Sequence, residues 1–146
     1  MEHELKITIN ADGGSRGNPG SSAIGVVIRG GGKEKKYSEF LGLRTNNEAE
    51  YESVIFALKK ARQLFGKEKT KKAEIDVFLD SELIVNQLNG KYKIEEEKLF
   101  PLFIKVWNLK MDFGKIIFQS VPREKNREAD RLVNMELDKK EQTKIF

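Results

Sequence analysis

The spacing of apolar residues changes partway along this 146-residue chain, and that change restricts the possible folds more than any other feature. Residues 5–11, 23–29 and 35–43 alternate apolar and polar side chains, which is typical of strands with one buried face. From Val54 onward, apolar residues recur at helical spacing through Phe65. Similar reasoning predicts a strand over 73–79, a short helix ending near 89–90, a helix beginning at 95–97, a strand over 115–121 and a helix over 126–137.

The predicted order is three strands, one helix, one strand, two helices, one strand and a final helix. Three consecutive strands joined by short turns favour an antiparallel unit, and the later alternation favours parallel strands with helical crossovers. We therefore expect an α/β fold with a five-stranded mixed sheet and helices on both faces. We expect one domain over residues 1–146, with a C-terminal tail over about 139–146.

Three local signals mark where the predicted elements begin and end. The glycine-rich segment Asp12–Gly20 is expected to form a turn that ends the first strand. Asn46 or Asn47 is expected to cap the first long helix, and Ser81 is expected to cap the short helix.

Composition excludes several classes of protein. The chain has no cysteine, so it has no disulfides, thiol nucleophiles or zinc–thiolate sites. No apolar run approaches 18 residues, and the amino terminus does not resemble a signal peptide, so we expect no membrane association and a cytoplasmic protein. The net charge is +4, and lysines gather at 33–36, 67–72 and 91–93. These clusters suit a polyanionic partner, although solvated loop lysines would look the same.

Four acids occupy positions where a structural residue would be ordinary. Asp12 and Asp80 each follow a predicted strand, at the sheet edge where α/β proteins bind ligands. Glu50 and Asp130 each continue the core-facing stripe of a predicted helix. Each also has a local explanation: a turn residue, a cap partner, a first-turn acid, or a surface ion pair of Asp130 with a neighbouring arginine.

Taken together, the four acids predict a metal site. Carboxylates that converge at one sheet edge repel each other unless they take up protons or cations. Oxygen ligands without histidine or cysteine favour Mg²⁺ or Mn²⁺. Two such ions can activate a water molecule and stabilise a leaving oxygen, which indicates phosphodiester hydrolysis.

Four sequence blocks that contain these acids resemble ribonuclease H type 1, in the order and spacing of that family and over nearly the whole chain. The blocks are Asp12–Gly20 (DGGSRGNPG), Thr45–Glu50 (TNNEAE), Leu79–Ser81 (LDS) and Asn126–Asp130 (NREAD). The resemblance implies an endonuclease that cuts the RNA strand of RNA–DNA hybrids with two Mg²⁺ ions, Mn²⁺ being a possible substitute. It implies 5′-phosphate and 3′-hydroxyl ends. It also implies that the catalytic residues and metal ligands are Asp12, Glu50, Asp80 and Asp130.

The same resemblance implies a set of substrate-binding residues: Gly13, Gly14, Asn18, Asn46 and Asn47. Asparagine suits this task because an amide offers both a donor and an acceptor to sugar hydroxyls and base edges in a shallow minor groove. Asn46 could instead be a plain helix cap, or serve in both ways, and Asn18 could be only a turn residue.

The chain departs from the family pattern in three places. Many members carry a histidine in the loop before the last aspartate, whereas residues 120–125 contain none and the only histidine is His3. We hypothesise that Arg123 or Glu124 reaches the site instead, although both could simply be solvated. Glu82 replaces a substrate-contacting amide. Residues 91–98 only bridge the place where some members insert a basic handle, as in short archaeal and some bacterial forms, some of which also cut duplex RNA.

Other functions remain open on sequence grounds. The chain could be a DNA nuclease of the same superfold, or a catalytically weak module that binds hybrids or duplex RNA. A calcium-buffering site is disfavoured because acidic loops with alternating ligands are absent. We expect a monomer. The apolar end, Ile145-Phe146, could dock on the domain; the spacing does not fit a sliding-clamp motif, and we expect no clamp binding.

Overall fold

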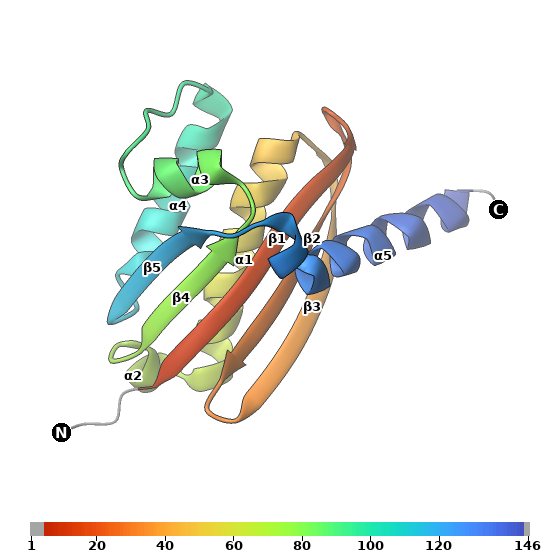
Figure 1. Cartoon of the computed structure of the whole chain (residues 1–146). Helices are drawn as coiled ribbons and strands as arrows, with labels where there is room; N and C mark the ends of the chain where they lie inside the picture. Colours follow the sequence, from red (N-terminus) through yellow and green to blue (C-terminus); the bar gives the residue numbers. More distant parts are fainter. Residues whose placement is uncertain (1–4, 145–146) are drawn as a thin grey trace.

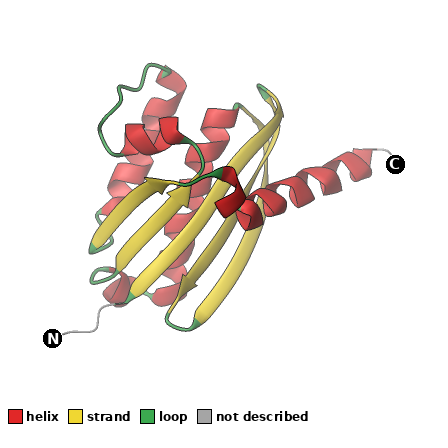
Figure 2. Ribbon diagram, in the orientation of Figure 1, coloured by secondary structure: helices red, strands yellow, loops and turns green. Residues whose placement is uncertain are grey.

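The computed structural model describes residues 5–144, which form one five-stranded sheet with helices on both of its faces (Figures 1 and 2). This arrangement confirms the expected α/β class. The elements in chain order are β1 (Lys6–Gly17), β2 (Gly20–Gly30), β3 (Lys33–Arg44), α1 (Asn46–Phe65), α2 (Lys67–Thr70), β4 (Glu74–Leu79), α3 (Glu82–Leu88), the 3₁₀ turn η1 (Glu97–Leu99), α4 (Phe100–Lys110), β5 (Lys115–Ser120), the 3₁₀ turn η2 (Arg123–Lys125) and α5 (Arg127–Lys144).

The strand order is β3-β2-β1-β4-β5, with β1–β2 and β2–β3 antiparallel and β1–β4 and β4–β5 parallel. The last residue pair between β1 and β4 joins Asn10 to Phe78. Continuing that register by two residues brings Asp12 level with Asp80, which directly follows β4. The pairing of these two strands therefore positions two of the four acids.

The main core lies between the sheet and α1, because the inward-facing residues of β1, β2 and β4 are almost entirely apolar. Ile7, Ile9, Val26, Ile28 and Val77 have no solvent exposure. On the opposite face, α5 crosses β1, β2 and β3 and buries a smaller cluster around Ala23 and Val133 (Figures 1 and 2).

Two of the predicted element boundaries near the first glycine-rich block were wrong. Strand β1 does not end at Ala11, before a turn over Asp12–Gly20, but continues to Gly17, because its pairing with β2 extends to the Gly17–Gly20 pair. The cap of α1 is Thr45, not Asn46 or Asn47. The Thr45 hydroxyl accepts from the Glu48 amide at 3.1 Å, and the Glu48 carboxylate accepts from the Thr45 amide at 2.9 Å. This reciprocal pair is a capping box.

The later helices also differ from expectation. Helix α4 begins at Phe100, after a 3₁₀ turn, because Pro101 fits only the first turn of a helix. Helix α5 continues to Lys144, so the segment expected to be a tail is helical as far as that residue. Ile145 and Phe146, for which docking on the domain was one possibility, lie outside the described residues, as does His3. None of the helices described combines the length and apolar character needed to cross a membrane.

Strand β3 forms one edge of the sheet, and its first residues are exposed lysines and a glutamate. Lys33, Lys35 and Lys36 all lie on this strand.

Ser81 caps α3 as predicted, its hydroxyl accepting from the Ile84 amide at 3.2 Å.

The contact between β2 and α5 leads to a testable prediction. A Cβ atom at Gly25 would lie 2.2 Å from the carbonyl oxygen of Ala129 and 2.8 Å from Cβ of Leu132. Gly25→Ala should therefore push α5 from the sheet and lower the free energy of unfolding by about 1–3 kcal/mol, measured by urea denaturation. Ser21→Ala in the same strand should change it by less than about 0.5 kcal/mol. Equal stability of Gly25→Ala and wild type would contradict this close packing.

Candidate active site

The predicted acids lie in a cleft of about 850 Å³ beside the second half of β1 and the carboxyl end of β4. Asp12, Glu50 and Asp80 each offer a carboxylate oxygen that lies within 4.8 Å of those of the other two. Asp130 lines the same cleft, and its charge acts on both Asp12 and Asp80. Three acids thus form a tight group, and the fourth lies at its border.

Glu50 reaches this group because α1 packs directly against β1. A Cβ atom at Gly13 would lie 2.1 Å from the carbonyl oxygen of Ala49, so only glycine allows this approach. The Gly13 amide then donates a 2.5 Å hydrogen bond to Oε1 of Glu50. Gly14 likewise faces α5, with its missing Cβ 3.3 Å from Cγ1 of Val133. The two glycines therefore set the distance between β1 and the helices that carry Glu50 and Asp130.

Asp130 is positioned by an asparagine that the sequence reasoning did not select. Asn126 is 1% exposed and immediately precedes α5. Its side-chain amide donates to the carbonyl oxygen of Ala11 at 2.9 Å, and its Oδ1 accepts from Asn10 at 3.1 Å. The Asp130 amide donates to the Asn126 carbonyl at 3.1 Å. The start of α5 is thereby fixed beside the residue that precedes Asp12.

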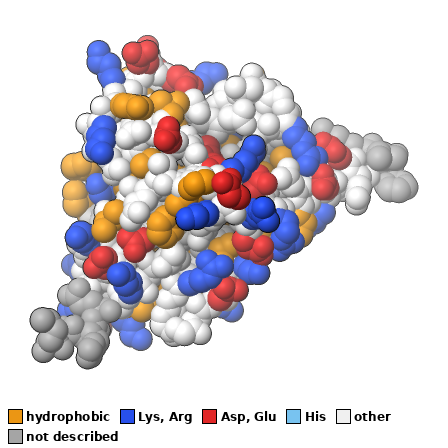
Figure 3. Space-filling view, viewed as in Figure 1, with side chains coloured by type: hydrophobic (Ala, Val, Ile, Leu, Met, Phe, Trp, Pro, Cys, Tyr) orange, Lys and Arg blue, Asp and Glu red, His pale blue; other side chains and the backbone are white. Residues whose placement is uncertain are grey.

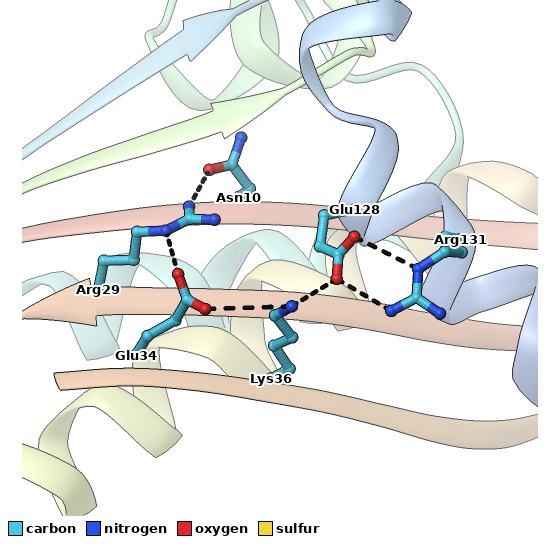
Figure 4. Close-up of polar contacts among 6 residues, drawn as sticks. All are labelled: Asn10, Arg29, Glu34, Lys36, Glu128 and Arg131. Atoms are coloured by element: carbon cyan, nitrogen blue, oxygen red, sulfur yellow. Dashed lines mark hydrogen bonds and ion pairs between the residues drawn. The ribbon is translucent and has the colours of Figure 1, made fainter.

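Further polar contacts extend from this junction across the open face of the sheet (Figure 4). Arg29 donates to Asn10 at 3.4 Å and pairs with Glu34 at 2.7 Å. Lys36 pairs with Glu128 at 2.7 Å, and Glu128 also pairs with Arg131. These two cations lower the pKa of Glu128 to about 2, that of Arg131 having the larger effect. Glu34 and Lys36, 4.0 Å apart, join these contacts into one network that reaches α5 at Glu128 (Figure 4). At its other end, Asn10 donates to Asn126, which directly precedes α5.

The electrostatics of the acid group favour protons or cations. Burial, followed by the charge of Asp80, raises the pKa of Asp12 from 3.8 to about 7. Burial, followed by the charge of Asp12, raises the pKa of Glu50 well above 4.5. Burial also raises the pKa of Asp80, although the nearby Arg123 opposes this effect. At neutral pH the three carboxyl groups therefore bind more protons than they would in water.

The same residues fit a hard divalent cation. Asp12 and Glu50 are each only 6% exposed, so water cannot fully compensate their charges. The close ligand atoms are all carboxylate oxygens, which are the donors that Mg²⁺ and Mn²⁺ prefer. A divalent ion would replace shared protons and relieve the repulsion among the carboxylates.

The expected amide residues adjoin the cleft and are already partly bonded. Oδ1 of Asn46 accepts from the Ser15 amide at 2.9 Å, and Oδ1 of Asn18 accepts from the Asn46 amide at 3.0 Å. The side-chain NH₂ group of Asn47 donates to Glu96 at 2.6 Å. Asn46 and Asn47 line the cleft, whereas Asn18 holds the β1–β2 turn against α1.

Of the two loop residues hypothesised to replace the missing histidine, Arg123 lines the cleft. Its Nη2 lies 3.8 Å from Oδ1 of Asp130. Glu124 is not among the lining residues. The structure adds Arg16 and Asn134 to the cleft; the sequence block DGGSRGNPG contains Arg16 but does not indicate where its side chain points. On the face shown in Figure 3, basic and acidic side chains are intermixed.

Comparisons with known sequences agree with this geometry. The family described as "Reverse transcriptase-like" matches residues 10–136. The chain is 36% identical over 129 residues to ribonuclease HI of Halobacterium salinarum. The aligned segment covers 87% of this chain and 62% of that protein. It is also 36% identical over 137 residues to a bifunctional protein of Mycobacterium tuberculosis, covering 92% of this chain. The chain spans only about a third of that mycobacterial protein (36%).

Solved structures with the same fold cover nearly the whole chain. The N-terminal RNase H domain of the mycobacterial protein has a TM-score of 0.85 at 35% identity, with 96% of this chain and 99% of that chain covered. LC11-RNase H1 in complex with an RNA/DNA hybrid has a TM-score of 0.83 at 42% identity, with 93% and 98% covered. RNase H1 of Halobacterium salinarum has a TM-score of 0.83 at 32% identity, with 92% and 98% covered. The resemblance inferred from the four sequence blocks is thus confirmed, and the chain belongs to the reverse transcriptase-like family and, within it, to the short type 1 ribonucleases H.

Proposed function

We propose that this chain is an endonuclease that hydrolyses the RNA strand of RNA–DNA hybrids and leaves 5′-phosphate and 3′-hydroxyl ends. The observation that carries the proposal is the group of three acids whose carboxylate oxygens lie within 4.8 Å of one another in an open polar cleft. A relative of 42% identity forms a complex with an RNA/DNA hybrid, which supports the choice of substrate.

We propose that Asp12, Glu50, Asp80 and Asp130 hold two Mg²⁺ ions, with Mn²⁺ as a substitute. When bound, such ions activate a water molecule and stabilise the leaving oxygen of the phosphodiester. The protein's own contribution is positional. The β1–β4 register, the Gly13–Ala49 approach and the buried Asn126 fix the acids before any substrate arrives.

The amide residues support recognition of a ribose-containing strand. The side-chain oxygens (Oδ1) of Asn46 and Asn18 already accept hydrogen bonds from backbone amides. The side-chain NH₂ group of each residue therefore remains as a donor for a ligand. Donors of this kind suit sugar hydroxyl oxygens and the acceptors of base edges in the minor groove. Asn47 could contact substrate only after its bond to Glu96 breaks. Gly13 and Gly14 line the cleft, but their missing Cβ atoms face α1 and α5, so any contact with the substrate would come from their backbone.

An assay on matched RNA–DNA, RNA–RNA and DNA–DNA duplexes tests this function. Wild type should cut the RNA of the hybrid with Mg²⁺ or Mn²⁺ and cut nothing in EDTA. Asp80→Asn should lower the rate more than about 100-fold, because it removes a charged metal ligand. Asp76→Asn, on the strand β4 that precedes Asp80, should leave the rate close to wild type.

The duplex panel also separates the alternatives. Cleavage of DNA–DNA would identify a DNA nuclease of the same superfold, and hybrid binding without cleavage would identify a binding module. Cleavage of RNA–RNA in addition to the hybrid would extend the substrate range to duplex RNA. Hybrid cleavage by Asp80→Asn at the wild-type rate would disprove the assignment of this residue.

The raised pKa values predict how stability depends on pH. The unfolded chain releases the Asp12 proton near pH 3.8, whereas the folded chain retains it until about pH 7. The folded state therefore binds more protons in this window, so its stability should fall as the pH rises from 3.8 to about 7 without metal. Mg²⁺ should raise Tm at pH 7.5 and have little effect at pH 4.

Thermal unfolding of wild type and Asp12→Asn, with and without Mg²⁺, checks this prediction. The variant should be more stable than wild type at pH 7.5 in metal-free buffer, because it removes one of the crowded charges. Identical pH profiles for the two proteins would show that Asp12 does not carry this pH dependence.

Arg123 is expected to take the place of the missing loop histidine as a cation at the edge of the site. We propose that it contacts the scissile region of the substrate, since its side chain is 79% exposed and lies beside Asp130. Arg123→Gln should lower kcat/KM by about tenfold, equivalent to ~1.4 kcal/mol. Lys125→Gln in the same turn is the matched control. An equal loss of kcat/KM in both variants would show that Arg123 acts only as a general surface charge.

A further inference from the structure

Arg16 is a cation of the cleft that already has three partners. It lies near the outer end of β1, and its side chain lines the cleft that contains the acid group. Its Nη2 lies 2.7 Å from Oδ1 of Asp138, and its Nη1 lies 2.8 Å from Oε1 of Glu141. Nη2 also donates to Oδ1 of Asn134 at 3.3 Å. One guanidinium group is therefore held by three side chains.

All three partners come from one face of α5, at positions 134, 138 and 141, which have the spacing of neighbouring helical turns. These positions lie in the second half of α5, where Leu137 packs on Ala23 of β2 and Phe40 of β3. The contacts join the outer turns of the helix to the hairpin formed by β1 and β2. The unexpected length of α5 therefore has a direct effect at the cleft, because Asp138 and Glu141 lie beyond its predicted end.

The ion pairs are exposed enough to exchange with another anion. The side chain of Arg16 is 33% exposed, and those of Asp138 and Glu141 are each 59% exposed. Exposed ion pairs of this kind contribute little to stability. The two non-bridging oxygens of a phosphodiester can accept a bidentate pair of hydrogen bonds from arginine, as a carboxylate can. A backbone phosphate that enters the cleft can therefore compete for the same guanidinium.

The net charge of this cluster acts against a nucleic acid. One arginine with two carboxylates carries a net charge of −1, at the side of a cleft that would have to admit a polyanion. We propose that Arg16 is a phosphate-contacting residue of the nucleic-acid groove, and that Asp138 and Glu141 compete with backbone phosphates for it. The two acids of α5 thereby weaken the binding of the duplex.

This inference rests on the proposed function, since it takes a nucleic-acid duplex as the ligand. Binding is measured by fluorescence anisotropy with a labelled RNA–DNA hybrid and Mg²⁺, in an Asp80→Asn background. Asp138→Asn with Glu141→Gln should lower Kd by about three- to tenfold. Arg16→Gln should raise Kd, and it should reduce the slope of log Kd against log salt by about 0.9, the value for one lost phosphate contact.

Two controls match these variants in charge. Glu68→Gln with Glu74→Gln removes two carboxylates at the opposite end of the sheet and should shift Kd less than the pair on α5. Lys139→Gln removes one cation from the same stretch of α5 and should affect Kd less than Arg16→Gln. Circular dichroism and Tm confirm that each variant is folded, and Arg16→Lys, which keeps the charge, should keep the salt slope near that of the parent.

Two results would overturn the inference. If Asp138→Asn with Glu141→Gln bound the hybrid as tightly as the parent or more weakly, the acids would only anchor the helix. If Arg16→Gln left both Kd and the salt slope unchanged, Arg16 would not contact phosphate. Failure of the proposed function would look different: the protein with Asp80 intact would leave the hybrid uncut, whatever the order of affinities among these variants.

Discussion

The carboxylates in the cleft carry like charges and do not attract one another, so the surrounding backbone has to hold them together. The parallel pairing of β1 with β4 sets Asp12 beside Asp80, and the close approach of α1 at Gly13 adds Glu50. Burial makes this arrangement more costly, as the raised pKa values of these groups show. The apolar core between the sheet and α1 supplies the free energy that keeps the arrangement in place. A rigid scaffold thus holds mutually repelling carboxylates close together, and protons or divalent ions can reduce that repulsion.

Much of the fold could be predicted from the sequence because it depends on local periodicity. The three alternating segments predicted the antiparallel strands, and the later α/β alternation predicted the parallel ones. Together with the long helix they gave the correct mixed five-stranded sheet. The four acids could be predicted because they occupy positions where a structural residue would be ordinary. In addition, the four sequence blocks that contain them occur in the order typical of type 1 ribonucleases H. Boundaries were predicted less well. Asn46 and Thr45 are both good capping residues, and only the reciprocal bond with Glu48 decides between them.

Other features depend on contacts between residues that are far apart in the chain. Asn126 bonds to Ala11 and Asn10 across more than a hundred residues, and its place in the NREAD block does not reveal that its side chain is buried. The outer half of α5 has few apolar residues, so its amphipathic pattern ends near Leu137 although the helix continues. Its polar residues are partly satisfied by Arg16, which comes from the opposite end of the chain. Such long-range pairing cannot be read from periodicity.

The strand order has a consequence for how the molecule behaves at high concentration. Strand β3 is twelve residues long and lies at the edge of the sheet, so a row of its backbone groups has no strand beside it. An edge of that length can recruit a strand from another molecule. The exposed Lys33 and Lys35 would have to lose bound water if this happened. These lysines therefore protect the chain against aggregation through its longest open edge.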